Sequence, residues 1–466
     1  MYKTLFILLI SSITFSQTLT SDNTFAMGTG IGVWQTNTTT TTTVRKILVQ
    51  PDNKIIVVGQ FKQFNGVDKQ CIVRLNVDGS IDTTFNVGTG ANSGIWDCIL
   101  QPNGKIIICG GFSNYNGYIS PRLVRLNSNG TFDSSFEVGS GINYYVRRVA
   151  IQPDGKIIAV GDFQSYNGIA RSCIVRINSD GSIDSTFNIG TGANQRINDV
   201  IIQPDGKIII VGEFTQYNGT LRRYIARLNS NGSLDTSYDV GTGAFNIIWD
   251  AELLPDNKLL IVGKFQSYNG IARNRVARIN TDGSLDTTFS VGTGANSDVM
   301  YVISDSDNKI YIGGSFTSFN SSTRNKFARL NENGSIDSSV TLQGTGFDET
   351  IDCIAKQSNK IIVGGSFTTY NGISKSRINR LEGLTLNNEE NSLNPTNFFP
   401  NPTTGLVFID GDLKFDYYEL YDVTGKLLLK NSLEGNTIEL EKYVNGVYFL
   451  KLFSNNNVTT KKIIKK

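Results

Sequence analysis

Histidine is absent from this chain of 466 residues. Its absence excludes Ser-His-Asp and Cys-His triads, histidine-ligated zinc and imidazole proton shuttles, so any chemistry would depend on carboxylates, tyrosine, lysine, serine or threonine. No apolar run reaches the roughly 18 residues that would predict a transmembrane helix. The chain has only 9 prolines against 47 glycines, and together with its short apolar runs this composition favours a turn-rich, all-β protein.

An excess of either charge is also lacking. Lys and Arg number 43 against 41 Asp and Glu, a formal net charge of +2, so the chain lacks the electrostatic footprint of a nucleic-acid partner. The five cysteines include no CxxC pair, and each occupies a position where neighbouring repeats carry apolar or long-stemmed residues. We therefore interpret the cysteines as core residues, and we expect no metal site and no cofactor.

Residues 1–16 have the pattern of a secretory signal peptide. Lys3 supplies positive charge, residues 5–13 are an apolar stretch too short to span a bilayer, and small residues follow as far as Ser16. Cleavage is expected after Ser16, which would leave an exported mature chain without a transmembrane segment.

The middle of the chain is a repeat with a fixed period of 51 residues. Its clearest marker is an asparagine that follows Phe or Tyr and precedes Gly, or Ser in one copy: Asn65, Asn116, Asn167, Asn218, Asn269, Asn320 and Asn371. A lysine and an arginine keep the same period, from Lys54 to Lys360 and from Arg74 to Arg380. The chain therefore contains seven copies of one unit.

Each unit reads as four short strands separated by turn residues. In the first unit the strands are expected at residues 47–50, 54–61, 71–76 and 82–85, with Pro-Asp-Asn, Asn-Gly and Asp-Gly turns between them. Four-stranded antiparallel units at this spacing predict the blades of a β-propeller. A helical solenoid would need a 3.6-residue apolar period, which is absent.

The two ends of the array complement each other. The last unit stops at residues 381–383 without the Asp-Gly-Ser-x-Asp-x-x-Phe ending of the other copies, and residues 22–25, Asp-Asn-Thr-Phe, match the missing piece. An N-terminal strand that completes the last blade would remove the exposed edges of an open stack. We therefore predict a seven-bladed β-propeller over residues 19–383, closed by an N-terminal outer strand.

The repeat resembles a known family. Its Gln-Pro-Asp-Gly-Lys-Ile-Ile core, Ala-Arg-Leu-Asn strand and Asp-Gly-Ser-Leu-Asp-Thr-x-Phe ending are similar to the delta-60 repeat family of β-propeller domains. Ser306 and Gln357 depart from the pattern at the turn proline, and Val340 stands in place of the outer Phe. Because the function of that family is unassigned, the resemblance implies the propeller fold and an exported protein but no ligand.

The last part of the chain breaks the period and is expected to be a separate domain. Residues 384–397 are rich in Asn and poor in large apolar residues, which suits a linker. Residues 398–466 contain several short alternating strands, which predict a small β-sandwich of the immunoglobulin-like type.

This last segment also resembles a known family. Its Phe-Pro-Asn-Pro start, Tyr-Asp-x-x-Gly-Lys turn and Asn-Gly-Val-Tyr-Phe-Leu strand are similar to the type A C-terminal sorting domain of the type IX secretion system of Bacteroidota. The resemblance implies that the type IX machinery handles residues 398–466 and exports the chain through the periplasm and the outer membrane. It also implies removal of this domain near the linker, with the propeller released or anchored at the cell surface.

Polar residues that recur in every unit are best explained as architecture. Arg74 and Asp82 lie eight residues apart across the Asp-Gly turn, so a three-residue loop would oppose them on one face of the sheet. The same spacing recurs in each unit up to the sixth. Arg380 has no local acid at that spacing, and we predict that its partner is Asp22 from the N-terminal strand.

Positions that differ between units are the candidates for function, because the scaffold does not dictate them. The first strand of each unit is expected to line the central channel, and an expanded loop opens near the same face. The candidate ligand-binding residues at this mouth are Trp34, Trp96, Trp249, Asp97, Asp199, Asp250, Asp352 and Arg147. Aromatic rings beside carboxylates are typical of a sugar or peptide site. The alternative is that these side chains only cap the ends of the sheets.

Two classes of function stay open. Near-identical blades and the lack of histidine favour a non-catalytic binding module, monomeric and secreted or displayed at the cell surface, with a glycan or peptide ligand. The alternative is a carbohydrate-active hydrolase or lyase that uses paired carboxylates among the four aspartates of the mouth. Two acids about 5 to 10 Å apart across an open cleft would support the enzyme, and no residue is assigned a catalytic role on sequence alone.

Overall fold

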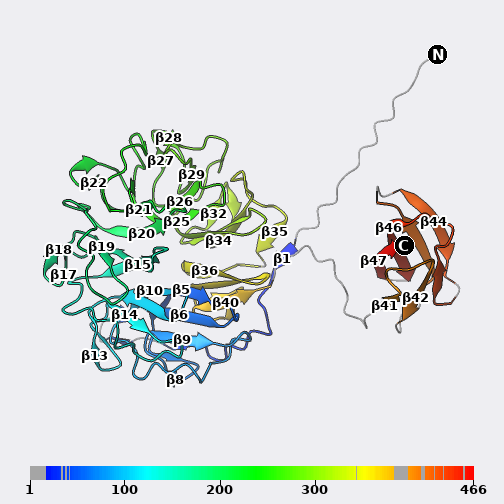
Figure 1. Ribbon diagram of the computed structural model, residues 1–466, viewed down its shortest axis with the longest axis horizontal. Helices are drawn as coiled ribbons and strands as arrows, with labels where there is room; N and C mark the ends of the chain where they lie inside the picture. The colour runs from blue at the N-terminus through cyan, green and yellow to red at the C-terminus, as the bar shows by residue number, and fades with distance from the viewer. Residues whose placement is uncertain are drawn as a thin grey trace, which may run out of the picture. The chain divides into compact units, whose positions relative to one another are not determined.

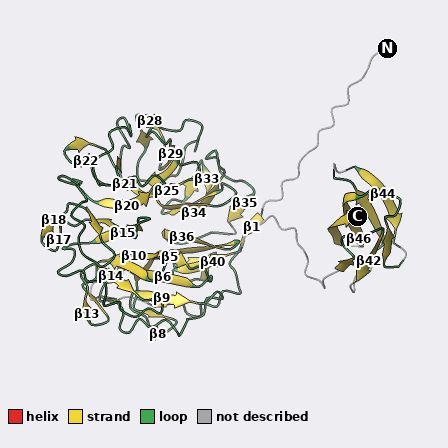
Figure 2. Cartoon of the chain, in the orientation of Figure 1, coloured by secondary structure: helices red, strands yellow, loops and turns green. Residues whose placement is uncertain are grey.

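A computed structural model describes residues 17–32, 35–36, 39–40, 42–342, 344–382, 397–410, 415–423, 426–433, 435–454 and 457–466. The expected signal peptide and residues 384–396 of the expected linker lie outside this description. The described residues form strands, turns and loops, and no helix occurs among them (Figure 2). The chain divides into two compact units between residues 384 and 385.

The seven repeats each form a three-stranded antiparallel sheet, in which a middle strand pairs with an innermost and a third strand. The innermost strands are β5 (Thr43–Val49), β10 (Ile95–Leu100), β15 (Val146–Ile151), β20 (Ile197–Ile202), β25 (Ile248–Leu253), β30 (Val299–Ser304) and β36 (Ile351–Gln357). The middle strands are β6 (Ile55–Gln60), β11 (Ile106–Gly110), β16 (Ile157–Gly161), β21 (Ile208–Gly212), β26 (Leu259–Gly263), β31 (Ile310–Gly314) and β37 (Lys360–Gly365). The third strands are β9 (Ile72–Leu75), β14 (Leu123–Leu126), β19 (Ile174–Ile177), β24 (Ile225–Leu228), β29 (Val276–Ile279), β34 (Phe327–Leu330) and β40 (Ile378–Leu381).

Local sequence accounts for these strands and their turns. The middle strands are almost wholly buried, as continuous Ile and Val runs predict for strands covered on both faces. The turn that precedes each middle strand ends in the left-handed region, with φ of 62° at Asn53 and 80° at Gly104. Cys98 pairs with Ile108 across the sheet, and all five cysteines are buried and free, which confirms their interpretation as core residues.

The prediction of a fourth strand at residues 82–85 is wrong, because these residues form a turn. A single antiparallel bridge, between Leu75 and Ile81 in the first repeat, is its only ladder contact. The Asp82 carboxylate then accepts the backbone N–H of Thr84 at 3.0 Å. An aspartate that bonds two residues ahead forms a turn, so the side chain ends the strand after one bridge.

Short two-stranded hairpins lie at the periphery of the ring (Figure 1), and the periodic asparagine and the residue after it form the turn of each hairpin. They are β7 (Gln63–Phe64) with β8 (Val67–Asp68), β12 (Asn114–Tyr115) with β13 (Tyr118–Ile119), β17 (Ser165–Tyr166) with β18 (Ile169–Ala170), β22 (Gln216–Tyr217) with β23 (Thr220–Leu221), β27 (Ser267–Tyr268) with β28 (Ile271–Ala272), β32 (Ser318–Phe319) with β33 (Ser322–Thr323) and β38 (Thr369–Tyr370) with β39 (Ile373–Ser374). The asparagine of each turn also holds the preceding Gly-x-Gly loop, as where the Asn116 side chain accepts the N–H of Thr89 at 3.1 Å.

The seven sheets surround a common centre (Figure 1). Innermost strands of consecutive repeats are neighbours, and β36 of the last repeat is the neighbour of β5 of the first. Separate apolar cores lie between adjacent sheets; one joins Ile56 and Cys71 of the first repeat to Ile95 and Ile108 of the second. Each repeat therefore shares its two faces with its neighbours, and no repeat could bury its apolar residues alone.

The N-terminal residues lie against the last sheets. β1 (Gln17–Leu19) pairs in parallel with β35 (Val340–Leu342), which follows the sixth repeat, and Ser21 forms an antiparallel bridge with Leu381. Further on, β2 (Ile31–Gly32) pairs with β7, and β3 (Gln35–Thr36) pairs with β4 (Thr39–Thr40).

The C-terminal unit consists of two antiparallel sheets. One contains β41 (Asn397–Phe399), β42 (Leu406–Asp410) and β45 (Thr437–Glu439). The other contains β44 (Leu427–Ser432), β43 (Tyr417–Tyr421), β46 (Gly446–Ser454) and β47 (Asn457–Lys465). Val407 and Ile438 of the first sheet share one buried cluster with Leu420, Leu450 and Ile463 of the second. This unit therefore has a core of its own.

Candidate functional site

The described candidate residues all lie in the first few residues of an innermost strand, at the end of the repeats that we call the front face. Residues 94–96 of the second repeat and 145–147 of the third lie there beside the ends of their middle strands; Gly111, for example, donates its N–H to the carbonyl of Gly94 at 2.9 Å. A register shift interrupts each innermost strand at this point, as between Ile95 and Asp97. The shift places consecutive residues in different surroundings.

Arg148 is the centre of a buried cluster of charges on the axis. Its guanidinium nitrogens lie 3.4 Å from Asp250, 3.6 Å from Asp199 and 4.0 Å from Asp97. The four residues come from four different innermost strands, and the Arg148 side chain is only 15% exposed. Lys46 occupies the place in the first repeat that Arg148 occupies in the third. It donates from Nζ to the Tyr301 hydroxyl at 2.8 Å.

The three aspartates are also hydrogen bonded to backbone of the repeat that follows their own. Asp97 accepts the N–H of Val149 at 3.0 Å. In the same way Asp199 accepts from Ala251 at 3.1 Å, and Asp250 accepts from Val302 at 2.9 Å. Their residues are 3%, 7% and 4% exposed. These carboxylates therefore connect neighbouring repeats inside the ring and do not face an open cleft.

Burial of this cluster shifts its protonation. Burial first, and then the neighbouring Asp250 carboxylate, raise the pKa of Asp199 to about 7, against the opposing charge of Arg148. Burial likewise raises the pKa of Asp250 and of Glu252, whose carboxylate accepts from the Ser304 hydroxyl at 3.2 Å. Asp199 and Asp250 are neighbours in this buried site, so desolvation favours a proton shared between these two carboxyls.

Asp352 has different partners. Its carboxylate accepts from the Thr43 hydroxyl at 2.6 Å and lies 3.3 Å from the Arg45 guanidinium. Those contacts join the seventh repeat to the first. The structure therefore does not bring Asp352 into the Arg148 cluster.

Trp96 belongs to a group of rings at the front face that we call the aromatic shelf: Trp96, Tyr144 and Tyr145. The ring centroids of Trp96 and Tyr145 are 4.7 Å apart, and those of Tyr144 and Tyr145 are 4.3 Å apart. The Arg147 guanidinium lies 4.1 Å from the centroid of Trp96 and is held by two hydrogen bonds of 3.1 Å to Asp162. The structure therefore joins two of the predicted site residues, Trp96 and Arg147.

The other two tryptophans are not part of the shelf as described. Trp249 lies in the fifth repeat, three repeats beyond Trp96, and its indole nitrogen is buried without a hydrogen-bond partner among the described residues. Trp34 lies outside the described residues. The mouth predicted from three tryptophans and four aspartates is thus divided into a buried axial cluster and a partly exposed aromatic group.

Sequence reasoning missed Tyr144, Tyr145 and Gly111. A signal was present, because Gly111 stands where the other repeats carry a side chain, and a Cβ atom there would come 3.1 Å from the Tyr145 ring. The missing side chain thus makes room for that ring. In the second, fourth, fifth and sixth repeats the positions of Tyr144 and Tyr145 carry Ser-Gly, Gln-Arg, Asn-Ile and Ser-Asp, so the two aromatic rings are particular to the third repeat among these.

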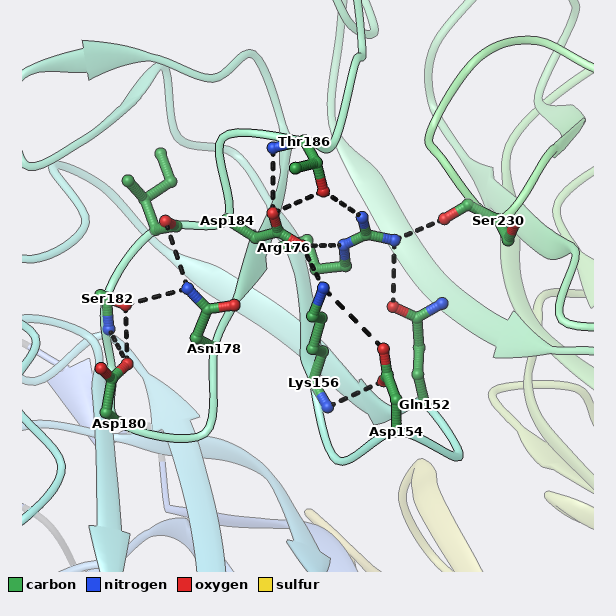
Figure 3. Close-up of polar contacts among 11 residues, drawn as sticks. Gln152, Asp154, Lys156, Arg176, Asn178, Asp180, Ser182, Asp184, Thr186 and Ser230 are labelled. Atoms are coloured by element: carbon green, nitrogen blue, oxygen red, sulfur yellow. Dashed lines mark hydrogen bonds and ion pairs between the residues drawn. The ribbon is translucent and has the colours of Figure 1, made fainter.

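A second network, formed by the periodic lysine and arginine with an aspartate, recurs in the repeats, and Figure 3 shows it in the third. In the third repeat Arg176 donates through Nε to Asp184 at 2.7 Å, and Lys156 donates to the same oxygen at 2.8 Å. Arg176 also donates to the carbonyl of Ser230 in the next repeat. Sequence reasoning anticipated the Arg–Asp opposition but assigned no role to the lysine, although it keeps the same period. The equivalent arginine of the first five repeats and of the seventh makes this bond to a carbonyl of the following repeat, so the network fixes those sheets to their neighbours.

Asp22 occupies the equivalent place at the last repeat. Its carboxylate is 2.7 Å from Nε of Arg380 and also accepts from Lys360. It accepts the N–H of Thr24 at 2.9 Å as well. The residues of the sequence-predicted pair are therefore in direct contact.

The described residues include neither a metal-binding cluster nor a membrane-spanning helix. No group of three or more cysteine, aspartate or glutamate side chains there is placed to hold a metal ion. No helix in the described part of the chain is long and apolar enough to cross a membrane.

Comparison with known families gives two matches. The β-propeller domain of unknown function DUF5122 matches residues 50–85, 101–136, 152–187, 203–238, 254–289, 306–339 and 356–383. The secretion system C-terminal sorting domain matches residues 397–466. None of the curated proteins matches this chain.

Solved structures give only distant likenesses. PorZ, a surface component of the type IX secretion system of Porphyromonas gingivalis, is 12% identical with a TM-score of 0.41; the match covers 93% of this chain and 57% of PorZ, so the chain spans just over half its length. The extracellular domain of BT4673 from B. thetaiotaomicron is 11% identical with a TM-score of 0.41, and the match covers 97% of this chain and 68% of that one. Likenesses at this level carry no argument about ligand or activity.

Proposed function

The chain belongs to the DUF5122 β-propeller family, and from this premise we propose that it is an exported, non-catalytic binding module whose ligand face is the front face. The observation that carries the proposal is the Arg148 cluster. Asp97, Asp199 and Asp250, the acids that a hydrolase would need at the axis, are buried and occupied by Arg148 and by backbone N–H groups. A glycosidase needs two carboxylates facing a substrate cleft.

Export follows from the sorting domain. Its match at residues 397–466 indicates handling by the type IX secretion machinery and delivery to the outer cell surface or the medium. We propose that residues 1–16 are the signal peptide that precedes this step, that residues 384–397 are the linker, and that the C-terminal unit is an immunoglobulin-like sandwich. Two sheets that share one core support the last point.

We further propose that the propeller occupies residues 19–383 and that the N-terminal segment completes the last blade. The bridge between Ser21 and Leu381 supports this closure. So does the hydrogen bond of 2.8 Å from the Asp22 N–H to the carbonyl of Arg380, because Asp82 makes the same bond to Arg74. A ring closed in this way would function as a monomer, since the array would have no open end and each sheet would keep only a short outer edge, next to the segment that bridges its third strand.

The binding site itself is assigned to Trp96 and Arg147 of the predicted set, with Tyr144 and Tyr145 added. Tyr144 is 48% exposed, and it lies on a front-face loop. Asp97, Asp199 and Asp250 are assigned to the scaffold. An exposed ring next to two half-buried rings and a held guanidinium is typical of binding sites on rigid folds.

Turnover and binding can be measured together. The mature chain would be incubated with a broad set of polysaccharides while reducing ends, unsaturated products and complex formation are followed. We expect binding without product. Product formation that Asp199→Asn or Asp250→Asn abolishes would overturn the proposal in favour of a hydrolase or lyase.

A further inference from the structure

We propose that the aromatic shelf binds an uncharged glycan, with sugar rings stacked on Tyr144, Tyr145 and Trp96. This inference rests on the proposed binding function and adds the chemical class of the ligand. The apolar face of a sugar ring, formed by its C–H groups, packs on an aromatic ring, while its hydroxyls need donors and acceptors at the edge of that ring.

The rings of the shelf form a platform, and the backbone of Gly111 and the Arg122 side chain hold its Tyr145 ring in place. Tyr145 packs over the bare backbone of Gly111 and is flanked by the Arg122 guanidinium, 5.9 Å from its centroid. Arg122 is itself fixed by bonds to the carbonyls of Gly111 and Phe112 at 2.8 and 2.9 Å. Tyr144 extends the platform into solvent. A rigid ring loses little conformational entropy on binding, so the platform is suited to a weak, repeated contact such as stacking.

An amide at the edge of the platform is left without its usual partner. In three other repeats the asparagine equivalent to Asn143 donates through Nδ2 to a hydroxyl, that of Ser113, Thr215 or Thr317, at 2.8 to 3.0 Å. The third repeat has Gln164 at that place, and no such bond is formed among the described residues. Asn143 still accepts the N–H groups of Gln164 and Ser165, so its position is fixed. Its Nδ2 donor, next to Tyr144, is therefore available to a sugar hydroxyl.

The charges beside the shelf neutralise one another. Asp162 lies between Arg147 and Arg196, at 3.1 and 2.8 Å, and Arg196 also lies 3.1 Å from Glu213. Positive and negative groups thus alternate in this chain of ion pairs, which has no net charge of its own; Arg122, bonded to the carbonyls of Gly111 and Phe112, is a further positive charge beside Tyr145. A uronic acid or a charged peptide would have to displace one of these pairs, whereas a neutral sugar need not.

The rings are tilted to one another, by 54° between Trp96 and Tyr145 and by 47° between Tyr144 and Tyr145, so the shelf offers separate ring faces to successive sugars of a glycan. A peptide that anchors through its side chains needs pockets. The groove of about 650 Å³ between the first and second repeats is lined by the turn residues Pro51, Pro102 and Ser128, at the end of the sheets opposite the shelf. Its lining contains no shelf residue.

The test uses the full mature chain and an array of neutral and charged oligosaccharides that includes cellohexaose, mannohexaose and xylohexaose. Binding is followed by tryptophan fluorescence and calorimetry. We expect at least one neutral oligosaccharide to bind, Tyr144→Ala to weaken it about tenfold or more, and Tyr144→Trp to retain it. Phe245→Ala is the matched control, because Phe245 is an aromatic residue of the same loop in the fifth repeat and is 68% exposed. It should leave the affinity unchanged.

A second variant tests the amide without removing a ring. Gln164→Thr supplies the hydroxyl that Thr215 and Thr317 provide elsewhere, so the Asn143 amide regains its partner; binding should weaken while the midpoint of urea unfolding stays the same. The inference is overturned if only charged oligosaccharides or peptides bind, or if Tyr144→Ala is neutral. If Phe245→Ala abolishes binding instead, the binding module stands and the shelf fails. Cleavage of the oligosaccharide would overturn the proposed function itself.

Discussion

Arg380 and Asp22 are 358 residues apart in the chain, yet they form the same ion pair that Arg74 and Asp82 form across eight residues. In both pairs Nε lies 2.7 Å from Oδ2. The remaining partners also correspond, since Asp22 accepts from Lys360 and Asp82 accepts from Lys54. Arg380 donates in addition to the carbonyl of Val77 in the first repeat. One acid from the N-terminal segment thus connects the two ends of the repeat array.

Removal of that acid should destabilise the whole propeller. The Asp22 side chain is fully buried, so Asp22→Ala leaves the charges of Arg380 and Lys360 without their partner, and loss of one member of a buried pair costs about 3 to 5 kcal/mol. We expect the free energy of unfolding in urea to fall by this amount, with a similar fall for Arg380→Ala. Asp154→Ala, at an exposed turn, is the control and should have little effect. Additive losses in a double-mutant cycle of Asp22 and Arg380 would contradict the coupling.

Low pH should weaken the protein through the same carboxylates. Burial alone would raise the pKa of Asp82, but hydrogen bonds from Thr84 and Lys54 outweigh it and hold the pKa well below its usual range. The equivalent residues behave alike: Asp22, Asp133, Asp184, Asp235 and Asp286. A carboxyl whose pKa is lowered by folding stabilises above its unfolded pKa of about 4, and this stability is lost as pH falls further. We expect a steep loss between about pH 4 and pH 2 in urea titrations.

The control for that titration is a variant in which one of these aspartates is replaced by asparagine, which cannot ionise. Asp184→Asn should be less stable than the parent near neutral pH, and its stability should vary less with pH between 4 and 2, because one proton fewer is taken up when the variant unfolds. A pH profile equally steep in the variant would show that these carboxylates are not the cause.

The regularity of the repeat is the reason that so much of the fold could be predicted. The Lys54, Arg74 and Asn65 positions recur with one spacing, and each has the same contact in its own sheet, so one correct interpretation serves seven times. The missing ending of the last repeat pointed to residues 22–25 for the same reason. The fourth strand could not be predicted from apolar alternation, because the Asp82 side chain competes for the backbone and turns the chain.

The site was harder to predict, since it depends on residues that different repeats bring together. Arg147 and Arg148 are adjacent in sequence, but the register shift between Val146 and Arg148 places one beside Trp96 and the other among three aspartates. Composition alone cannot tell which arginine faces the axis. Composition therefore predicted a single binding site with aspartates and aromatic rings side by side, whereas Asp97, Asp199 and Asp250 are buried.

Loss of Arg148 should be far more damaging than loss of Arg147. Arg148→Met leaves three buried carboxylates without their counter-ion and should lower the free energy of unfolding by about 3 to 5 kcal/mol near pH 8. The Arg147 side chain is 29% exposed, and among the described residues its ion pair is with Asp162. Arg147→Met should therefore lower the free energy of unfolding by only about 0 to 1 kcal/mol. Urea unfolding of both variants measures this. Equal losses would contradict the axial role of Arg148.

The sorting domain should be dispensable for folding and required for export. The two units have separate cores, so a chain ending at residue 391 should retain the parent's cooperative unfolding. In a cell with a type IX system, immunoblots of medium and cell fractions should find the truncated chain inside the cell envelope and the full chain outside. Efficient release of the truncated chain would contradict the role assigned to residues 397–466.

The axial cluster should also give the protein an unusual loss of stability as pH rises toward neutrality. The pKa of Asp199 is about 7 in the folded chain, above its ordinary value of 3.8, with burial as the main cause and Asp250 as the next. A group whose pKa is raised by folding stabilises fully below its unfolded pKa, and that stability is lost as pH rises through the folded pKa. The groups that face it are Arg148, Asp250, Asp97, Lys46, Tyr301 and Glu252. We therefore expect the free energy of unfolding to decline between about pH 4 and pH 7. Asp199→Asn keeps an oxygen for the N–H of Ala251 but cannot ionise, so its stability should change less over this range, and an unchanged slope would show that another group binds the proton.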